Sequence, residues 1–331
     1  MNDMTRAQTT PPPALTARLA RLLPVGSLAL GIASAVWMSR KPDRAPLIIG
    51  AALFGWVGIT LAVVVNRRVA RAKDISKRAR ALRWFALAAS QTVVLQALVF
   101  PIPFFARALW PLSPQHLPFV VVYVAALIVG LWDPWYEKVA ARPAALVALQ
   151  GFAAFVASLT VLPIVGFTNT HTFIAAGVVV AVGSPLGFWL VGVGRHRLVG
   201  SVLCALVMAC LVVAGAPLVP PAPLSLEAGT LCVSVVHRQP QGAARRFVAP
   251  SELVCHTAIR APLGLRDQLV HVWSSEGRWL QTVALDVSGG AGTHGFRTWS
   301  RLKHPPQGRV SCRVETTLGQ LVGVVDADVV P

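Results

Sequence analysis

The stretch AALVALQGFAAFVASLTVLPIV, residues 144–165, contains no aspartate, glutamate, lysine or arginine. An α-helix rises 1.5 Å per residue, so this segment is about 33 Å long as a helix, and the hydrocarbon core of a bilayer is about 30 Å thick. A surface helix of a soluble protein carries polar residues along one face, and this segment has no such face. The segment therefore predicts a transmembrane helix.

Six further uncharged runs lie on both sides of this segment. Together they predict seven spans: Leu22–Met38, Ala45–Val65, Phe85–Ala106, Pro118–Trp132, Ala144–Val165, Thr172–Val193 and Leu198–Val219. Of the 331 residues, 55% are apolar and 13% are charged, whereas about a quarter of the residues of a soluble protein are charged. The composition excludes a soluble single-domain enzyme and a disordered chain, and it indicates a multi-pass helical membrane protein.

The basic residues between the spans indicate how the chain is oriented. The tail 1–21 and the second, fourth and sixth connections hold fifteen Lys and Arg residues, and the other three connections hold four. Lys and Arg are enriched in short cytoplasmic loops, so we expect a multi-pass membrane protein with a cytoplasmic N-terminus and an extracytoplasmic C-terminal domain. If the first span is instead a cleaved signal peptide, six spans remain and the C-terminal domain keeps this side.

The net charge of +17 is thus explained by membrane orientation, and no nucleic-acid partner is expected. The second connection is the most basic, and we expect it to contact anionic lipid headgroups through Arg67, Arg68, Arg71, Lys73, Lys77, Arg78, Arg80 and Arg83. No Asp, Glu, Lys, Arg or His lies within a span, which argues against an ion-coupled or proton-coupled carrier. Gln91, Gln96 and Gln150 are expected to join helices by hydrogen bonds.

Residues 225–331, which follow a proline-rich linker at 220–224, have the composition of a soluble domain. Short β-prone segments separated by turn residues predict an all-β, sandwich-like domain of seven strands. The predicted strands are Thr230–His237, Glu252–Arg260, Gln268–Ser274, Arg278–Val287, Gly295–Leu302, Arg309–Thr316 and Leu321–Val329.

Three cysteines of this domain, Cys232, Cys255 and Cys312, permit one disulfide, with all three pairings open. A buried free Cys312 is an equally supported alternative, because Cys312 alternates in phase with valines. Metal binding by Cys255 and His256 is disfavoured, since adjacent strand residues point to opposite faces. No metal, cofactor or catalytic residue set is predicted, and the Gly-rich segment 290–295 precedes a strand and therefore lacks the helix that a dinucleotide site requires.

Two strand motifs place aromatic and basic residues on a common face. His271 and Trp273 share one face of their strand, as do Arg297, Trp299 and Arg301 of theirs. If the two strands are neighbours, the five residues form one surface suited to an anionic or sugar-like ligand. The alternative, which we favour, is that the tryptophans fill the core and the arginine stems cover them.

Short motifs in both parts of the chain resemble a family of bacterial multi-pass inner-membrane proteins that end in a β-rich domain of unknown function. The motifs are FPIPFF (100–105), DPWY (133–136), LPIV (162–165), CHTAIRAPLGL (255–265), HVW (271–273), GFRTWS (295–300) and GQLVG (319–323). Val310 departs from the pattern, because many relatives have tryptophan at this position. The resemblance implies this architecture and a location in the bacterial inner (cytoplasmic) membrane, and it supplies no catalytic residue.

These observations favour a non-enzymatic membrane protein whose outer β domain binds an envelope protein or polymer. The alternative is a transporter or a lipid-handling protein that uses the helix bundle. An enzyme is the third possibility, with the outer loop Thr168–His171 as its best region, although no acid, base and nucleophile are recognisable there.

Overall fold

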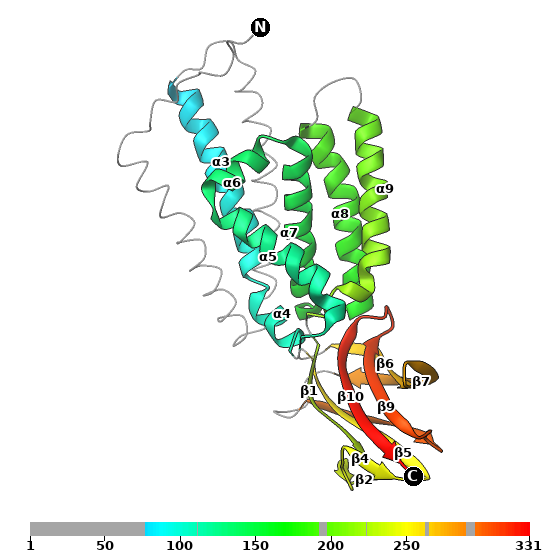
Figure 1. Cartoon of the computed structure of the whole chain (residues 1–331). Helices are drawn as coiled ribbons and strands as arrows, with labels where there is room; N and C mark the ends of the chain where they lie inside the picture. Colours follow the sequence, from blue (N-terminus) through cyan, green and yellow to red (C-terminus); the bar gives the residue numbers. More distant parts are fainter. Residues whose placement is uncertain (1–76, 111, 192–196, 223, 262–264, 289–294) are drawn as a thin grey trace.

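The computed structural model describes residues 77–331 except 111, 192–196, 223, 262–264 and 289–294. In this part of the chain, apolar helices are followed by a β-rich C-terminal region, which lies at one end of the helices (Figure 1). The predicted tail 1–21 and the predicted spans Leu22–Met38 and Ala45–Val65 lie outside the described residues, as does most of the Gly-rich segment 290–295.

The helical part contains long apolar helices joined by short ones. Its elements are α3 (Lys77–Val99), α4 (Ile102–Ala108), η2 (Pro114–His116), α5 (Leu117–Leu131), α6 (Asp133–Ala140), α7 (Pro143–Ile164), α8 (Asn169–Val191), α9 (Arg197–Gly215) and η3 (Ala216–Leu218). Among the residues that the structure describes, five segments are long and apolar enough to cross a membrane: Leu87–Ala108, Pro114–Leu131, Ala144–Ile164, Asn169–Trp189 and Leu198–Leu218. They coincide with the third to seventh predicted spans, and the total of seven stays a prediction.

Prolines set several of the helix boundaries. Helix α3 ends at Val99 and α4 begins at Ile102, because Pro101 and Pro103 cannot donate the backbone hydrogen bonds that would continue a single helix. In contrast, α8 continues through Pro185 as one helix.

Hydrogen bonds between polar side chains join the helices as predicted. Nε2 of Gln91 on α3 donates to the carbonyl oxygen of Gly130 (3.0 Å) and to Oδ1 of Asp133 (2.8 Å). Nε2 of Gln150 on α7 donates to Oγ of Ser90 (3.3 Å), which also bonds the hydroxyl of Tyr136 (2.7 Å). Buried polar groups need such partners, so these residues fix how α3, α6 and α7 pack.

The β-rich region agrees closely with the predicted strands from Glu252 onward. Its strands are β1 (Ser225–Cys232), β2 (Ser234–Val236), β3 (Gln239–Gln241), β4 (Arg246–Val248), β5 (Glu252–Arg260), β6 (Arg266–Ser275), β7 (Arg278–Ser288), β8 (Phe296–Lys303), β9 (Gly308–Thr316) and β10 (Leu321–Val330). The prediction of one strand over Thr230–His237 was wrong. The first strand begins at Ser225, because residues 225–229 pair with β5, with an irregularity between Leu226 and Ala228. The sequence did not predict this part of the strand, because these residues have low β propensity.

The strands form two main sheets whose inner faces share a buried core. One sheet has the order β1-β5-β8 and the other β4-β10-β9-β6-β7, while β2 and β3 form a separate ribbon. A single buried cluster contains Leu253 of β5, Trp273 of β6, Val310 of β9 and Val325 of β10. The two sheets therefore pack against each other through this cluster.

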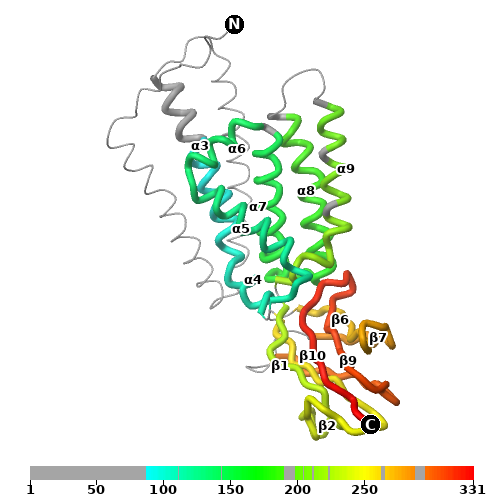
Figure 2. The backbone as a smooth tube through the Cα atoms, viewed as in Figure 1, coloured from blue at the N-terminus to red at the C-terminus, as the bar shows by residue number. Residues whose placement is uncertain are grey.

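Polar bonds attach the β-rich region to the helical part. Gln320, just before β10, donates from Nε2 to the carbonyl oxygen of Val219 (3.0 Å) and accepts from Nδ2 of Asn169 (2.5 Å). A ring nitrogen of the buried His116 lies 3.1 Å from the carbonyl oxygen of Leu321. Figure 2 shows the β9–β10 end of the sheet against the ends of the helices. These bonds hold the strands in a fixed position on the helices.

Candidate functional site

The five residues that would form one aromatic and cationic surface if their strands were neighbours do not share a surface. Strand β8 pairs with β5 in the three-stranded sheet, whereas β6 pairs with β7 and β9 in the other sheet. His271 and Trp273 are fully buried on the inner face of β6, while Trp299 is 36% exposed. Because the two motif strands are not neighbours, the predicted surface is divided between the core and the outside.

The outer face of β8 presents a line of basic and aromatic side chains. Thr298, Ser300 and Leu302 are buried, so the residues that alternate with them point outward. These outward residues, which we name the β8 strip, are Arg297, Trp299, Arg301 and Lys303.

The surroundings of the β8 strip leave most of its positive charge uncompensated. Nη1 of Arg301 lies 3.4 Å from Oε1 of Glu252. Among the described residues, no carboxylate lies within ion-pair distance of Arg297 or Lys303. Guanidinium and ammonium groups without a partner are available for an external anion.

Trp299 is held flat against a histidine of the neighbouring strand. Its ring stacks on His256, which is its direct partner in the β5–β8 register, with the ring centroids 6.5 Å apart and the planes at 13°. A ring nitrogen of His256 lies 3.2 Å from the carbonyl oxygen of Arg238. Burial lowers the pKa of His256, so its ring is neutral near pH 7 and adds no charge beneath the indole.

The residues predicted to contact lipid headgroups fall partly outside the described residues. Arg67, Arg68, Arg71 and Lys73 lie outside them, and Lys77, Arg78, Arg80 and Arg83 belong to the N-terminal half of α3. Figure 1 shows the start of α3 at the end of the helices away from the strands.

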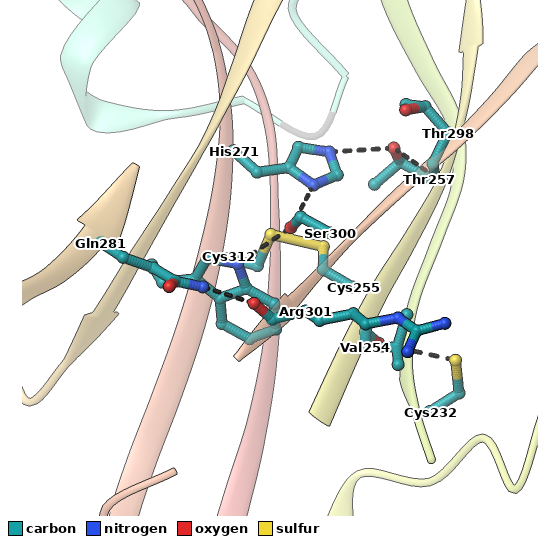
Figure 3. Close-up of a disulfide and its surroundings, with 11 residues drawn as sticks. Cys232, Val254, Cys255, Thr257, His271, Gln281, Thr298, Ser300, Arg301 and Cys312 are labelled. Carbon is teal, nitrogen blue, oxygen red and sulfur yellow. Dashed lines mark hydrogen bonds between the residues drawn. A yellow bond between two sulfur atoms is a disulfide. The ribbon is translucent and has the colours of Figure 1, made fainter. Parts of the chain in front are cut away.

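The inner faces of the two sheets are joined by a disulfide. Cys255 of β5 is bonded to Cys312 of β9, with Cα atoms 6.5 Å apart (Figure 3). Cys232 is a buried free thiol, and burial raises its pKa. The alternative of a free Cys312 was therefore wrong. The alternation of side chains along β9 correctly placed Cys312 inside the domain. Its bonding partner, Cys255, lies opposite on β5.

A chain of hydrogen bonds surrounds the imidazole next to this disulfide. Nε1 of Trp273 donates to Oγ of Ser300 (2.9 Å), which lies 2.8 Å from Nδ1 of His271. Nε2 of His271 lies 3.1 Å from Oγ1 of Thr257, which donates to the carbonyl oxygen of Thr298 (3.4 Å).

The donors and acceptors of this chain assign the tautomer of His271. The hydroxyl of Thr257 donates its proton to the carbonyl oxygen of Thr298, so it can only accept a hydrogen bond from Nε2–H of His271. Nδ1 of His271 then has no proton and accepts a hydrogen bond from the hydroxyl of Ser300. Burial lowers the pKa of His271 to about 4, which fits a neutral ring with a lone pair on Nδ1.

Three groups that bind metals converge at this position. Cys255, His271 and Cys312 are all buried, and their ligand atoms lie within 4.8 Å of one another. This group was not predicted from the sequence, where only the neighbouring His256 suggested itself as a metal-binding partner of Cys255. The alternation along each strand indicates that each of the three side chains points inward. The order of the strands, which brings the three residues together, cannot be read from the sequence.

The polar loop Thr168–His171 caps a helix and contacts the β-rich region. Oγ1 of Thr168 accepts from the backbone N–H of His171 (3.1 Å), which is a typical N-cap bond. Oδ2 of Asp267 on β6 accepts from the backbone N–H of Asn169 (2.8 Å). Burial raises the pKa of Asp267, and these backbone bonds oppose the shift. The polarity of this loop is thus used to join α8 to β6.

Comparison with known proteins places the chain in a family. No curated protein matches it. The model of a family of unknown function, DUF5924, matches residues 2–254, so the match covers the helical part and ends just before Cys255. Because the matched region is more than half of the chain, the protein belongs to the family of unknown function DUF5924.

Proposed function

We propose that this membrane protein is non-enzymatic and that its β-rich domain, a β-sandwich on the extracytoplasmic side of the bacterial inner membrane, binds an anionic polymer of the cell envelope. The observation that carries the proposal is the β8 strip of Arg297, Trp299, Arg301 and Lys303. An envelope protein with an anionic surface is the other partner that this strip would fit.

The spacing of the β8 strip suits a ligand with repeated anionic groups. Alternate residues of a strand lie about 6.8 Å apart on the same face, so Arg297, Arg301 and Lys303 offer a row of cations with Trp299 between them. Guanidinium groups bind carboxylates and phosphates through paired hydrogen bonds, and an indole ring supplies a flat apolar surface. A polymer that carries both acidic groups and sugar rings would engage both kinds of side chain.

The attachment of the domain to the helices also supports this function. Bonds from Gln320 and His116 hold the β9–β10 end of the domain on the helical part, whereas the β8 strip belongs to the other sheet. Because the membrane anchor already restricts the orientation of the domain, the domain loses little further freedom when it binds a polymer of the envelope. The entropic cost of binding is therefore smaller than for a freely tumbling domain.

The proposed side of the domain is tested with reporter fusions. Two connections between helices are predicted to be cytoplasmic: the one with Lys138 and Arg142 and the one with Arg195 and Arg197. The strands would then lie on the extracytoplasmic side. Alkaline phosphatase fused after Pro331 is therefore expected to be active in cells, and a reporter that works only in the cytoplasm is expected to be silent at the same position. The reverse pair of results contradicts the proposed side.

The binding function is tested by changing two residues of the β8 strip in the full chain. Arg297→Ala combined with Trp299→Ala is expected to weaken binding to purified peptidoglycan sacculi or lipopolysaccharide at least tenfold, which corresponds to about 1.4 kcal/mol. Loss of one guanidinium contact and one stacking surface is the physical reason. The affinity is measured on detergent-solubilised protein at several salt concentrations, with neutral dextran as the negative ligand.

A matched control is available on β7. Arg278→Ala combined with Trp279→Ala removes the same two residue types, and Trp279 is 67% exposed, so this variant is expected to bind like the wild type. Equal losses in the two double variants, or no loss in the β8 variant, contradict the proposal. If wild-type protein binds neither polymer but retains an anionic envelope protein, the polymer assignment is replaced by the protein partner.

A further inference from the structure

Two cysteines and one histidine from three different strands meet in the core of the β-rich domain. Cys255 comes from β5, His271 from β6 and Cys312 from β9, and their possible ligand atoms lie within 4.8 Å of one another. Figure 3 shows the imidazole of His271 beside the sulfur pair, with Ser300 next to both. In the disulfide form the sulfur atoms are bonded to each other. The dithiol form of the same fold would present two thiols and an imidazole at one point.

We propose that, when Cys255 and Cys312 are reduced, their thiolates and Nδ1 of His271 bind one Zn²⁺ ion, so that the metal and the disulfide are alternative links between the two sheets. Reduction by a dithiol breaks the S–S bond: the dithiol is oxidised to its own disulfide, and the two cysteines receive two electrons and two protons. Zn²⁺ then replaces the two thiol protons, which leave to solvent. Cysteine sulfur and histidine nitrogen are the usual ligands of zinc.

The hydrogen bonds of His271 already orient it as a metal ligand. Nε2–H donates to Thr257, which fixes the tautomer and leaves the lone pair on Nδ1. That lone pair meets only the hydroxyl of Ser300, which can rotate away. Histidines that bind metals almost always donate their other ring N–H to a protein group in this way. The hydrogen bond that would orient His271 as a zinc ligand is therefore already present in the disulfide form.

Charge balance favours a divalent ion. Two thiolates and a neutral imidazole carry a charge of −2 together, so Zn²⁺ makes the buried group neutral, whereas Cu⁺ would leave one uncompensated negative charge in a site without solvent. No other His, Cys, Asp or Glu joins this group among the residues that the structure describes. The hydroxyl oxygen of Ser300, which lies 2.8 Å from Nδ1 of His271, is a candidate for a fourth ligand.

The proposal is tested with Co²⁺ as the spectroscopic probe on the full chain in detergent. The protein is reduced with dithiothreitol, passed through an anaerobic column, and assayed for free thiols. One equivalent of Co²⁺ is expected to give a thiolate-to-cobalt charge-transfer band and the visible bands of a tetrahedral site, and one equivalent of Zn²⁺ is expected to abolish both. The oxidised wild-type chain, which has the same fold, is expected to give neither signal.

Variants assign the signal to these residues. Cys255→Ser is expected to abolish the charge-transfer band, and Cys232→Ser, which removes the other buried thiol of the domain, is expected to keep it. A reduced chain that binds no Co²⁺, whether its strands remain folded or not, overturns the proposal. So does a band that survives Cys255→Ser, a Cys255–Cys312 bond that dithiothreitol cannot reduce in the native chain, or a reduced chain that binds Cu⁺ but not Zn²⁺.

Discussion

Replacing Cys255 and Cys312 together with alanine is expected to lower the free energy of unfolding of the β-rich domain by about 4 kcal/mol. The disulfide closes a loop with a sequence separation of 57 residues, and a crosslink of that span removes about 4 kcal/mol of chain entropy from the unfolded state. Both positions are fully buried, so the lost sulfur atoms also leave small cavities, which add to the cost. Chemical denaturation of the full chain in detergent, followed by near-ultraviolet circular dichroism without reductant, measures the loss.

The third cysteine of the domain is the matched control for this prediction. Cys232 is equally buried but free, so Cys232→Ala is expected to cost only about 1 kcal/mol, the size of a typical small substitution in a core. Alkylation before and after reduction, followed by mass spectrometry, is expected to find only Cys232 modifiable among these three residues in the unreduced, denatured chain. Equal destabilisation by the two variants, or alkylation of Cys255 before reduction, would show that the pairing is wrong.

The membrane part of the fold was the easiest to predict from the sequence. The run 144–165 has no charged residue, and its helix extends over nearly the same residues, from Pro143 to Ile164. The reason is physical, since every backbone polar group must be paired within a span, and a long uncharged segment has no alternative to a helix. Of the three glutamines predicted to link helices, Gln91 and Gln150 do so, because an amide in such a setting needs a partner, whereas no such link from Gln96 is found among the described residues.

The strands were predictable locally but their neighbours were not. The alternation along β8 correctly placed Trp299 and Arg301 on one face, because side chains alternate in any strand. The pairing of β8 with β5 and of β6 with β9 depends on contacts between residues far apart in the sequence. For this reason the sequence left open whether His271 and Arg297 share one surface, and it left all three pairings of the cysteines open, including the observed bond from Cys255 to Cys312.

Substitution of Trp273 on β6 and of Trp299 on β8 tests which of the two tryptophans belongs to the core and which to the surface. Trp273→Ala is expected to destabilise the β-rich domain by about 4 kcal/mol, within the range found for removal of a buried aromatic side chain. Trp273 is 0% exposed, packs in the cluster shared by the two sheets, and donates from Nε1 to Ser300. Trp299→Ala, at a position 36% exposed, is expected to cost less than about 1 kcal/mol, because substitutions on the surface have small effects.

Trp273→Phe separates packing from hydrogen bonding at the same position. Phenylalanine retains much of the apolar contact but has no N–H, so Ser300 keeps its bond to His271 and loses one donor. The expected cost is about 1–3 kcal/mol, the range for a polar group left without its partner. All three variants are compared in the full chain by the denaturation assay used for the disulfide. If Trp299→Ala proved as costly as Trp273→Ala, both tryptophans would belong to the core, and the β8 strip would lose the aromatic residue on which its proposed ligand depends.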